Sequence, residues 1–207
     1  TKRVAEKLIQ SKSLDSNVKY MAVRFGNVIG SSGSVIPIFQ KQIRDGGPIT
    51  ITNPKMKRYF MSISESAQLI LQAGSIGKGG EIFVLDMGNP VNIKDIAFEL
   101  IKLSGLEPEK DISIEYIGSR PGEKLFEELK TSEESIAKTS HDKILMMKNA
   151  KEENWNYMFK FASKILDSAK TYNINKISKE LKNFVPEYKP EKNQFNRAYK
   201  KTIFSEK

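Results

Sequence analysis

The chain has 207 residues, of which 39% are hydrophobic and 29% charged, values that are ordinary for a soluble globular protein. It contains no cysteine and a single histidine, which excludes disulfides, thiolate metal sites and cysteine nucleophiles. No apolar run approaches the ~18 to 20 residues of a membrane span, so we expect no span and a cytoplasmic location.

The net charge of +9 is distributed unevenly along the chain. Residues 138–207 hold 16 of the 34 Lys and Arg but only 8 of the 25 Asp and Glu, so the basic excess lies in the C-terminal part. Basic tails can bind nucleic acid or anionic lipid, but Lys mixed with Glu and Asn is more typical of solvated helix faces. We therefore expect no nucleic-acid partner.

Alternating helix and strand patterns predict an α/β fold. The expected elements, in chain order, are a helix over 1–12, a strand over 20–25, a Gly/Ser-rich loop over 26–34, a helix over 35–44, a strand over 49–52, a helix from 64, strands over 81–87 and 112–117 with a helix over 93–104 between them, a loop over 119–123 and a helix over 124–129. Residues 81–87 are typical of a strand buried on both faces. From 130 onward the pattern is mostly helical, with helices over 152–170 and 175–184.

Three features of the sequence indicate an anionic ligand. The Gly/Ser loop leads into a helix start, where backbone amides favour phosphate. Arg58 and Arg120 lie outside the predicted helices and offer planar donors for the same group, so a diphosphate would satisfy all three features. The alternative is that the glycines only form turns and that both arginines pair with surface carboxylates. Composition alone leaves the two readings open.

Five blocks of sequence identify a family. They span residues 24–37, 46–52, 58–63, 83–88 and 120–129. In this order they resemble the polysaccharide biosynthesis CapD-like family of nucleotide-sugar dehydratases and epimerases, of the extended short-chain dehydrogenase class. The resemblance implies the C-terminal part of a Rossmann-type fold with a small α/β substrate-binding lobe in residues 1–130, followed by a basic, mostly helical tail in residues 131–207.

The resemblance also implies roles for individual residues. Lys2 matches the active-site lysine of the Tyr-x-x-x-Lys motif, a catalytic residue that also binds the cofactor through the nicotinamide ribose. The implied substrate-binding residues are Asn27 at the sugar nucleotide, Val35, Ile49, Thr50 and Ile51 along the nucleobase, Arg58 and Arg120 at the diphosphate, and Glu123 near the nucleotide ribose. His141 has no partner at metal-ligand spacing, so we expect neither a metal site nor a catalytic role for it.

The resemblance implies an NAD(P)-dependent 4,6-dehydratase acting on UDP-N-acetylglucosamine for capsule or O-antigen. A nucleotide-sugar 4-epimerase uses the same binding half and is the alternative within the enzyme class. A non-catalytic UDP-sugar-binding module is the alternative outside that class.

The cofactor half of such an enzyme is not recognisable in the sequence. No Gly-x-x-Gly-x-x-Gly segment follows a strand and opens a helix, and Lys2 is the sole catalytic residue that the match carries over. We therefore expect a fragment that is inactive alone and does not bind NAD(P) tightly by itself. Its expected partners are a UDP-sugar and, across the exposed sheet edge, a second copy or a separate cofactor-binding half. The parent is expected to be anchored to the inner face of the cell membrane.

Overall fold

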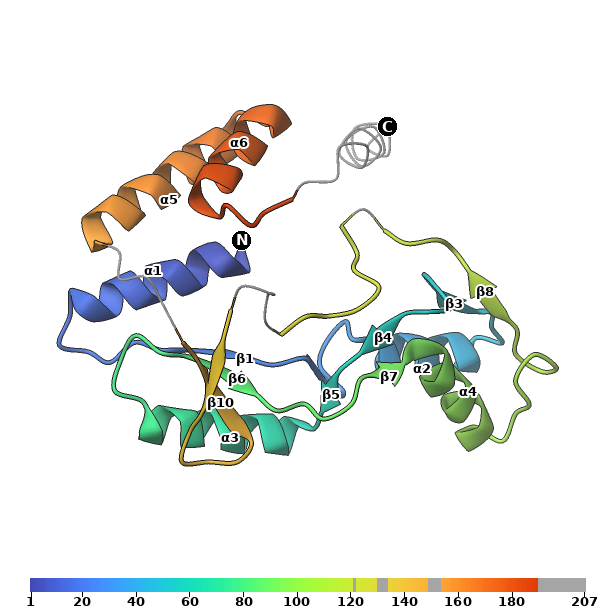
Figure 1. The fold of residues 1–207 in the computed structure, drawn as a ribbon. Helices are drawn as coiled ribbons and strands as arrows, with labels where there is room; N and C mark the ends of the chain where they lie inside the picture. Colours follow the sequence, from blue (N-terminus) through green and yellow to red (C-terminus); the bar gives the residue numbers. More distant parts are fainter. Residues whose placement is uncertain (121, 130–133, 149–153, 190–207) are drawn as a thin grey trace.

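The computed structural model describes residues 1–120, 122–129, 134–148 and 154–189. Its larger sheet has four strands in the order β1 (Ala22–Arg24), β6 (Ile82–Leu85), β10 (Ile144–Met147) and β9 (Ile136–Lys138). Strands β1 and β6 are parallel, whereas β10 runs antiparallel to both β6 and β9. Helices α1 (Lys2–Leu14) and α3 (Ile63–Ile76) lie on opposite sides of this sheet (Figure 1). The predicted α/β architecture is confirmed.

Strand β6 forms the centre of this half of the molecule. None of its four residues is more than 4% exposed. Phe83 and Leu85 pack with α3, and the alternating residues Ile82 and Val84 pack with Met147 on the other face. Because strand side chains alternate between faces, burial on both sides requires a continuous apolar run. The sequence prediction for this strand is confirmed.

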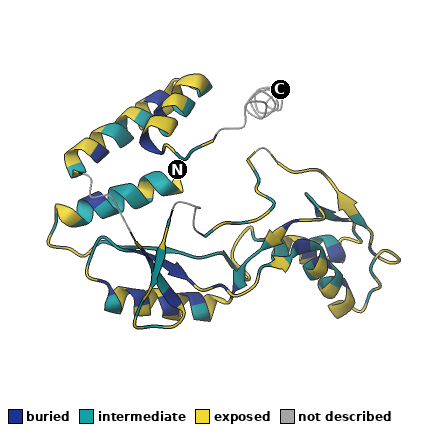
Figure 2. Ribbon diagram, viewed as in Figure 1, coloured by how far each residue is buried: buried dark blue, intermediate teal, exposed yellow. Residues whose placement is uncertain are grey.

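A second, smaller unit, called here the small lobe, consists of two helices and two strands. They are α2 (Val35–Arg44), β3 (Ile49–Ile51), α4 (Ile93–Leu103) and β8 (Ile114–Tyr116), with β3 and β8 parallel. Their apolar faces form one core, which contains Phe39, Ile43, Ile49, Ile51, Met56, Ile93, Ala97, Ile101 and Ile112. The buried residues of α2 and α4 face inward, and the exposed ones face outward (Figure 2).

Short strand pairs join the two units. Strand β2 (Asn27–Val28) pairs with β5 (Phe60–Met61), and β4 (Lys57–Arg58) pairs with β7 (Val91–Asn92). These pairs lie between the larger sheet and the small lobe (Figure 1). Within these pairs, β2 is the next strand after β1 and β7 is the next strand after β6, so both follow the carboxyl end of a strand of the larger sheet. This is the edge at which open α/β sheets bind ligands.

The C-terminal helices pack against the first helix. Helices α5 (Trp155–Lys170) and α6 (Ile174–Phe184) form a pair beside α1 (Figure 1). Their buried residues Met158, Phe184 and Val185 contact Val4 and Leu8. Within the described ranges, no helix has both the length and the apolar composition that crossing a membrane requires.

Two stretches differ from the sequence prediction. The helix expected over 124–129 is wrong, because this segment is non-helical and forms a bridge between Phe126 and Lys57. Strands β9 and β10 lie in a stretch predicted to be mostly helical. Strand β10 pairs with β6, which is about 60 residues away in sequence, and β9 pairs with β10. Strand formation depends on such packing more than on local preference. The helix over 175–184 is confirmed, and the helix over 152–170 is confirmed from Trp155, since residues 152 and 153 lie outside the described residues.

We expect Asn92→Ala to lower the free energy of unfolding by about 1 kcal/mol. Asn92 is the N-cap of α4, where its Oδ1 accepts a hydrogen bond of 2.8 Å from the Lys94 amide, and its Nδ2 donates to the Pro54 carbonyl at 3.3 Å. Urea denaturation measures the change. Asn92→Asp keeps the acceptor and should retain most of the stability; an equal loss in both variants would contradict the capping argument.

Candidate functional site

The Gly/Ser loop over 26–34 leaves the carboxyl end of β1 and enters α2. A Cβ on Gly26 would lie 2.7 Å from the Cβ of Tyr59, so only glycine lets the loop pass β5 at this distance. At the other end, Ser34 is the N-cap of α2, and its Oγ is buried with no hydrogen-bond partner among the described residues. The loop thus brings Asn27 and an unsatisfied hydroxyl to the junction between the two units.

Arg58 braces the segment 122–129 against β4. Its Nη1 donates to the carbonyl oxygens of Lys57 and Leu125 at 2.8 and 3.1 Å, and its Nη2 donates to the Lys124 carbonyl at 2.8 Å. The side chain is only 14% exposed. The bonds to Lys124 and Leu125 tie the non-helical segment to β4, and the three carbonyl bonds together engage three of the five guanidinium N–H groups. In this conformation the terminal nitrogens of Arg58 bind carbonyl oxygens of the protein's own backbone.

Arg120 has the opposite surroundings. Its backbone is fixed by Glu123, whose Oε2 accepts the Arg120 amide at 2.9 Å and whose Oε1 accepts the Thr52 hydroxyl at 3.1 Å. The Arg120 residue is exposed, and its guanidinium makes no hydrogen bond or ion pair with any residue in the described part of the chain. A positioned backbone with an uncommitted guanidinium is suited to bind an anion from solution. Through its bonds to the Arg120 amide and the Thr52 hydroxyl, Glu123 positions this loop.

Glu127 is a residue of this site that the sequence reasoning did not single out. Its Oε2 accepts a hydrogen bond of 3.3 Å from the side-chain Nδ2 of Asn27, and its Oε1 lies 3.5 Å from Nε of Arg58. It therefore joins two residues predicted to hold the substrate. Nothing in the local pattern distinguishes it from Glu128, which is 61% exposed and pairs with Lys124.

The residues predicted along the nucleobase have different exposures. Ile49 and Ile51 are 0% and 2% exposed and belong to the core of the small lobe, so their side chains support the site from inside. Thr50 is engaged by Gln42, through bonds of 2.8 Å to its hydroxyl and 3.2 Å to its amide. Val35 begins α2 and packs against the same core. Direct contact by these side chains with a base stays a prediction.

Lys2, the predicted cofactor residue, lies exposed in the first turn of α1. A dinucleotide needs a glycine-rich strand-to-helix turn that lets backbone amides approach its pyrophosphate. Among the described residues, the strand-to-helix loop with this composition, over 26–34, runs from β1 through the short strand β2 to α2 of the small lobe. That the chain by itself does not bind NAD(P) tightly, and that the cofactor needs groups beyond Lys2, stays a prediction.

A network of ion pairs ties α1 to the sheet and to the C-terminal segment. Arg24 pairs with Glu6 at 2.6 Å and with Glu134 at 2.9 Å. Arg3 pairs with the same two carboxylates and with Glu187, at 2.9, 3.1 and 3.2 Å. Arg24 also donates to the Leu129 carbonyl at 3.0 Å. The hydrogen bond from Arg24 to Glu6 raises the pKa of Arg24, so its charge is permanent.

We expect the chain to lose stability in acid through Glu6. Burial by itself would raise the pKa of Glu6, but the hydrogen bonds and charges of Arg24 and Arg3 together hold its pKa below the ordinary value of 4.5. A carboxyl with a depressed folded-state pKa stabilises the fold above its unfolded pKa, and this contribution disappears as the pH falls through the folded value. Melting temperatures between neutral pH and about pH 3 should fall less steeply for Glu6→Gln than for the parent chain. Parallel curves would contradict this assignment.

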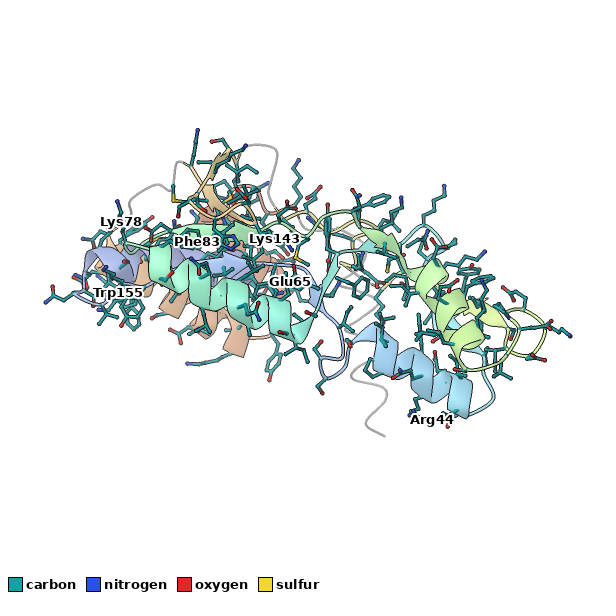
Figure 3. The ribbon with its side chains drawn as sticks, turned by 90° about the horizontal axis from the view of Figure 1, so that it is seen from below. Arg44, Glu65, Lys78, Phe83, Lys143 and Trp155 are labelled. Carbon is teal, nitrogen blue, oxygen red and sulfur yellow. The ribbon has the colours of Figure 1, made fainter. Side chains whose placement is uncertain are left out.

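A shallow pocket of about 240 Å³ lies at the carboxyl end of β6. It is lined by Phe60, Met61, Glu65, Asp86, Met87, Gly88 and Lys143. Lys143 and Glu65 form an ion pair of 2.7 Å in this lining, and Figure 3 shows the two labelled residues next to each other. Arg44, at the end of α2, lies away from this pocket (Figure 3). The charges of Lys143 and Glu65 are therefore paired with each other.

Comparison with known proteins places this geometry in a family. Residues 1–149 match the family described as polysaccharide biosynthesis protein. The chain is similar to the capsular polysaccharide biosynthesis protein CapD of Staphylococcus aureus, with 57% identity over 145 residues, which are 70% of this chain and 24% of that protein. It is also similar to the UDP-glucose 4-epimerase of Rickettsia bellii, with 37% identity over 137 residues, which are 65% of this chain and 39% of that protein. The chain thus spans less than half the length of these curated relatives.

A solved structure gives the same result for the fold. The X-ray structure of Pen from Bacillus thuringiensis matches with a TM-score of 0.64 and 36% sequence identity, over 74% of this chain and 48% of that chain. The predicted fold class, the C-terminal part of a Rossmann-type extended short-chain dehydrogenase, is confirmed. The chain belongs to the polysaccharide biosynthesis protein family, the family that its five sequence blocks resemble.

Proposed function

We propose that this chain is the sugar-nucleotide-binding part of a nucleotide-sugar 4,6-dehydratase that acts on UDP-N-acetylglucosamine, in the cytoplasm, for capsule or other surface polysaccharide. The observation that carries the proposal is the exposed Arg120 guanidinium on a loop fixed by Glu123 and Thr52. A guanidinium held in this way provides a charge-assisted bond to a diphosphate with little ordering of the backbone.

The remaining residues of the site fit the same ligand. Asn27 begins β2, shortly after the end of β1, and in this proposal its side-chain amide meets the sugar nucleotide. Ser34 has a buried hydroxyl that lacks a partner among the described residues. A ligand oxygen at the start of α2 would satisfy this hydroxyl and would benefit from the helix N-terminus. In this proposal the chain binds and orients the UDP-sugar, while NAD(P), when bound, supplies hydride transfer.

A nucleotide-sugar 4-epimerase is the second candidate. The similarity to a UDP-glucose 4-epimerase supports it, and the same substrate-binding residues would serve. The two activities differ in their products, because dehydration removes one water from the sugar and epimerisation leaves its mass unchanged. Mass spectrometry of the nucleotide sugar, after incubation of this chain with a cofactor-binding half and NAD(P), distinguishes them.

Calorimetric titration of the purified chain tests the binding role. We expect saturable binding of UDP and UDP-N-acetylglucosamine, and weaker binding of uridine, which lacks the diphosphate. The absence of binding to a chain that circular dichroism shows to be folded would contradict the proposal. Binding without turnover in the reconstituted mixture would instead favour a non-catalytic UDP-sugar-binding module.

A further inference from the structure

The Glu127 carboxylate lies where the site would receive an anion. Its Oε2 lies 3.3 Å from the side-chain Nδ2 of Asn27, and its Oε1 lies 3.5 Å from Nε of Arg58. The Glu127 side chain is 33% exposed. Both neighbours are hydrogen-bond donors of the protein: a side-chain amide and a guanidinium. An amide and a guanidinium around one anionic oxygen are also the donors that recognise phosphate.

The remaining donors of Arg58 explain why this contact matters. Its Nη1 and Nη2 donate to the carbonyls of Lys57, Leu125 and Lys124, so the Nε group is directed to Glu127. A ligand anion that binds the same groups of Asn27 and Arg58 would therefore have to displace the Glu127 carboxylate. A diphosphate would be repelled by this like charge at short range, because the site is partly shielded from water.

We propose that Glu127 is an internal competitor that occupies the anion position of Asn27 and Arg58 and is displaced by the ligand's phosphate. This inference rests on the proposed sugar-nucleotide binding. It assigns to Glu127 a role in setting affinity: the carboxylate keeps the two donors paired and oriented, and it weakens the binding of anions. Glu123, four residues earlier, differs because its oxygens hold the Arg120 amide and the Thr52 hydroxyl.

The test compares Glu127→Gln with Glu128→Gln. The two substitutions remove the same charge from adjacent positions, but Glu128 pairs with the exposed Lys124 instead of with site residues. We expect Glu127→Gln to tighten UDP binding roughly 2- to 5-fold, the scale of one partly exposed charge interaction. Glu128→Gln should leave the dissociation constant within about 1.5-fold, within the range of a solvent-screened pair. Uridine, without phosphate, should bind both variants and the parent chain equally.

The outcomes separate this inference from the proposed function. Unchanged or weaker UDP binding by a folded Glu127→Gln chain overturns the internal competitor, while binding by the parent chain still supports the proposed function. Failure of UDP to bind the parent chain and both variants overturns both. If Glu127→Gln tightens the binding of uridine as much as that of UDP, the inference is also overturned, because uridine has no phosphate that could displace the carboxylate.

A measurement on the unmodified chain keeps the inference testable if Glu127→Gln does not fold. The Nε–Hε resonance of Arg58 in ¹H–¹⁵N spectra reports the group that faces Glu127. Addition of UDP should shift this resonance, whereas uridine should leave it in place. A resonance that UDP at saturating concentration does not move would overturn the inference, because Glu127 would then remain on Arg58.

Discussion

Replacing Arg24 by alanine is expected to lower the free energy of unfolding by about 3 to 5 kcal/mol, the cost of removing one partner from a largely buried ion pair. The Arg24 side chain is 17% exposed and contacts Glu6 and Glu134, which are 14% and 11% exposed. Without Arg24, Glu6 and Glu134 would each lose an ion pair, and the Leu129 carbonyl would lose a donor. The link between α1, β1 and the segment before β9 would weaken.

Urea denaturation of Arg24→Ala measures this loss. The matched control is Arg44→Ala, which removes an exposed arginine at the end of α2 and should change stability by about 0.5 kcal/mol or less. A loss below about 1 kcal/mol for Arg24→Ala would show that the network behaves like solvent-screened surface pairs.

Arg120→Ala is expected to weaken UDP binding by about 1.5 to 3 kcal/mol, the scale of a hydrogen bond to a charged group. This is roughly a ten- to hundredfold change in the dissociation constant. The melting temperature should stay the same, because the Arg120 guanidinium makes no hydrogen bond or ion pair with the described residues, while its backbone keeps its bond to Glu123. Arg58→Ala would be less informative, since it removes three bonds to backbone carbonyls as well as a candidate ligand contact.

Lys124→Ala is the control for Arg120→Ala. It removes a positive charge from the same segment, but Lys124 pairs with Glu128 at 3.0 Å and is 67% exposed. Calorimetric titration of both variants should show a large loss for Arg120→Ala and little for Lys124→Ala. Equal losses would mean that UDP responds to the general charge of the surface instead of to a specific guanidinium.

The positions of the helices and of the central strand could be predicted from the sequence because their signals are local. Apolar spacing predicted α2 and α4. The continuous apolar run predicted β6 and its burial on both faces, because this signal lies within the strand's own residues. The five sequence blocks also identified the family, and with it the positions of Arg120 and Glu123 in one loop.

Contacts between residues far apart in sequence decided the rest. Arg24 and Glu134 are separated by 110 residues, and Asn27 and Glu127 by 100, so no local pattern predicts either pair. Strand β10 forms between β6 and β9, and the segment 124–129 is non-helical where Arg58 binds the carbonyl oxygens of Lys124 and Leu125. The sequence by itself determined the fold class and the family of the chain. Only the tertiary structure decided that Arg58 braces the backbone, that Arg120 stays uncommitted among the described residues and that Glu127 shares the site, because each depends on which groups the fold brings within hydrogen-bonding distance.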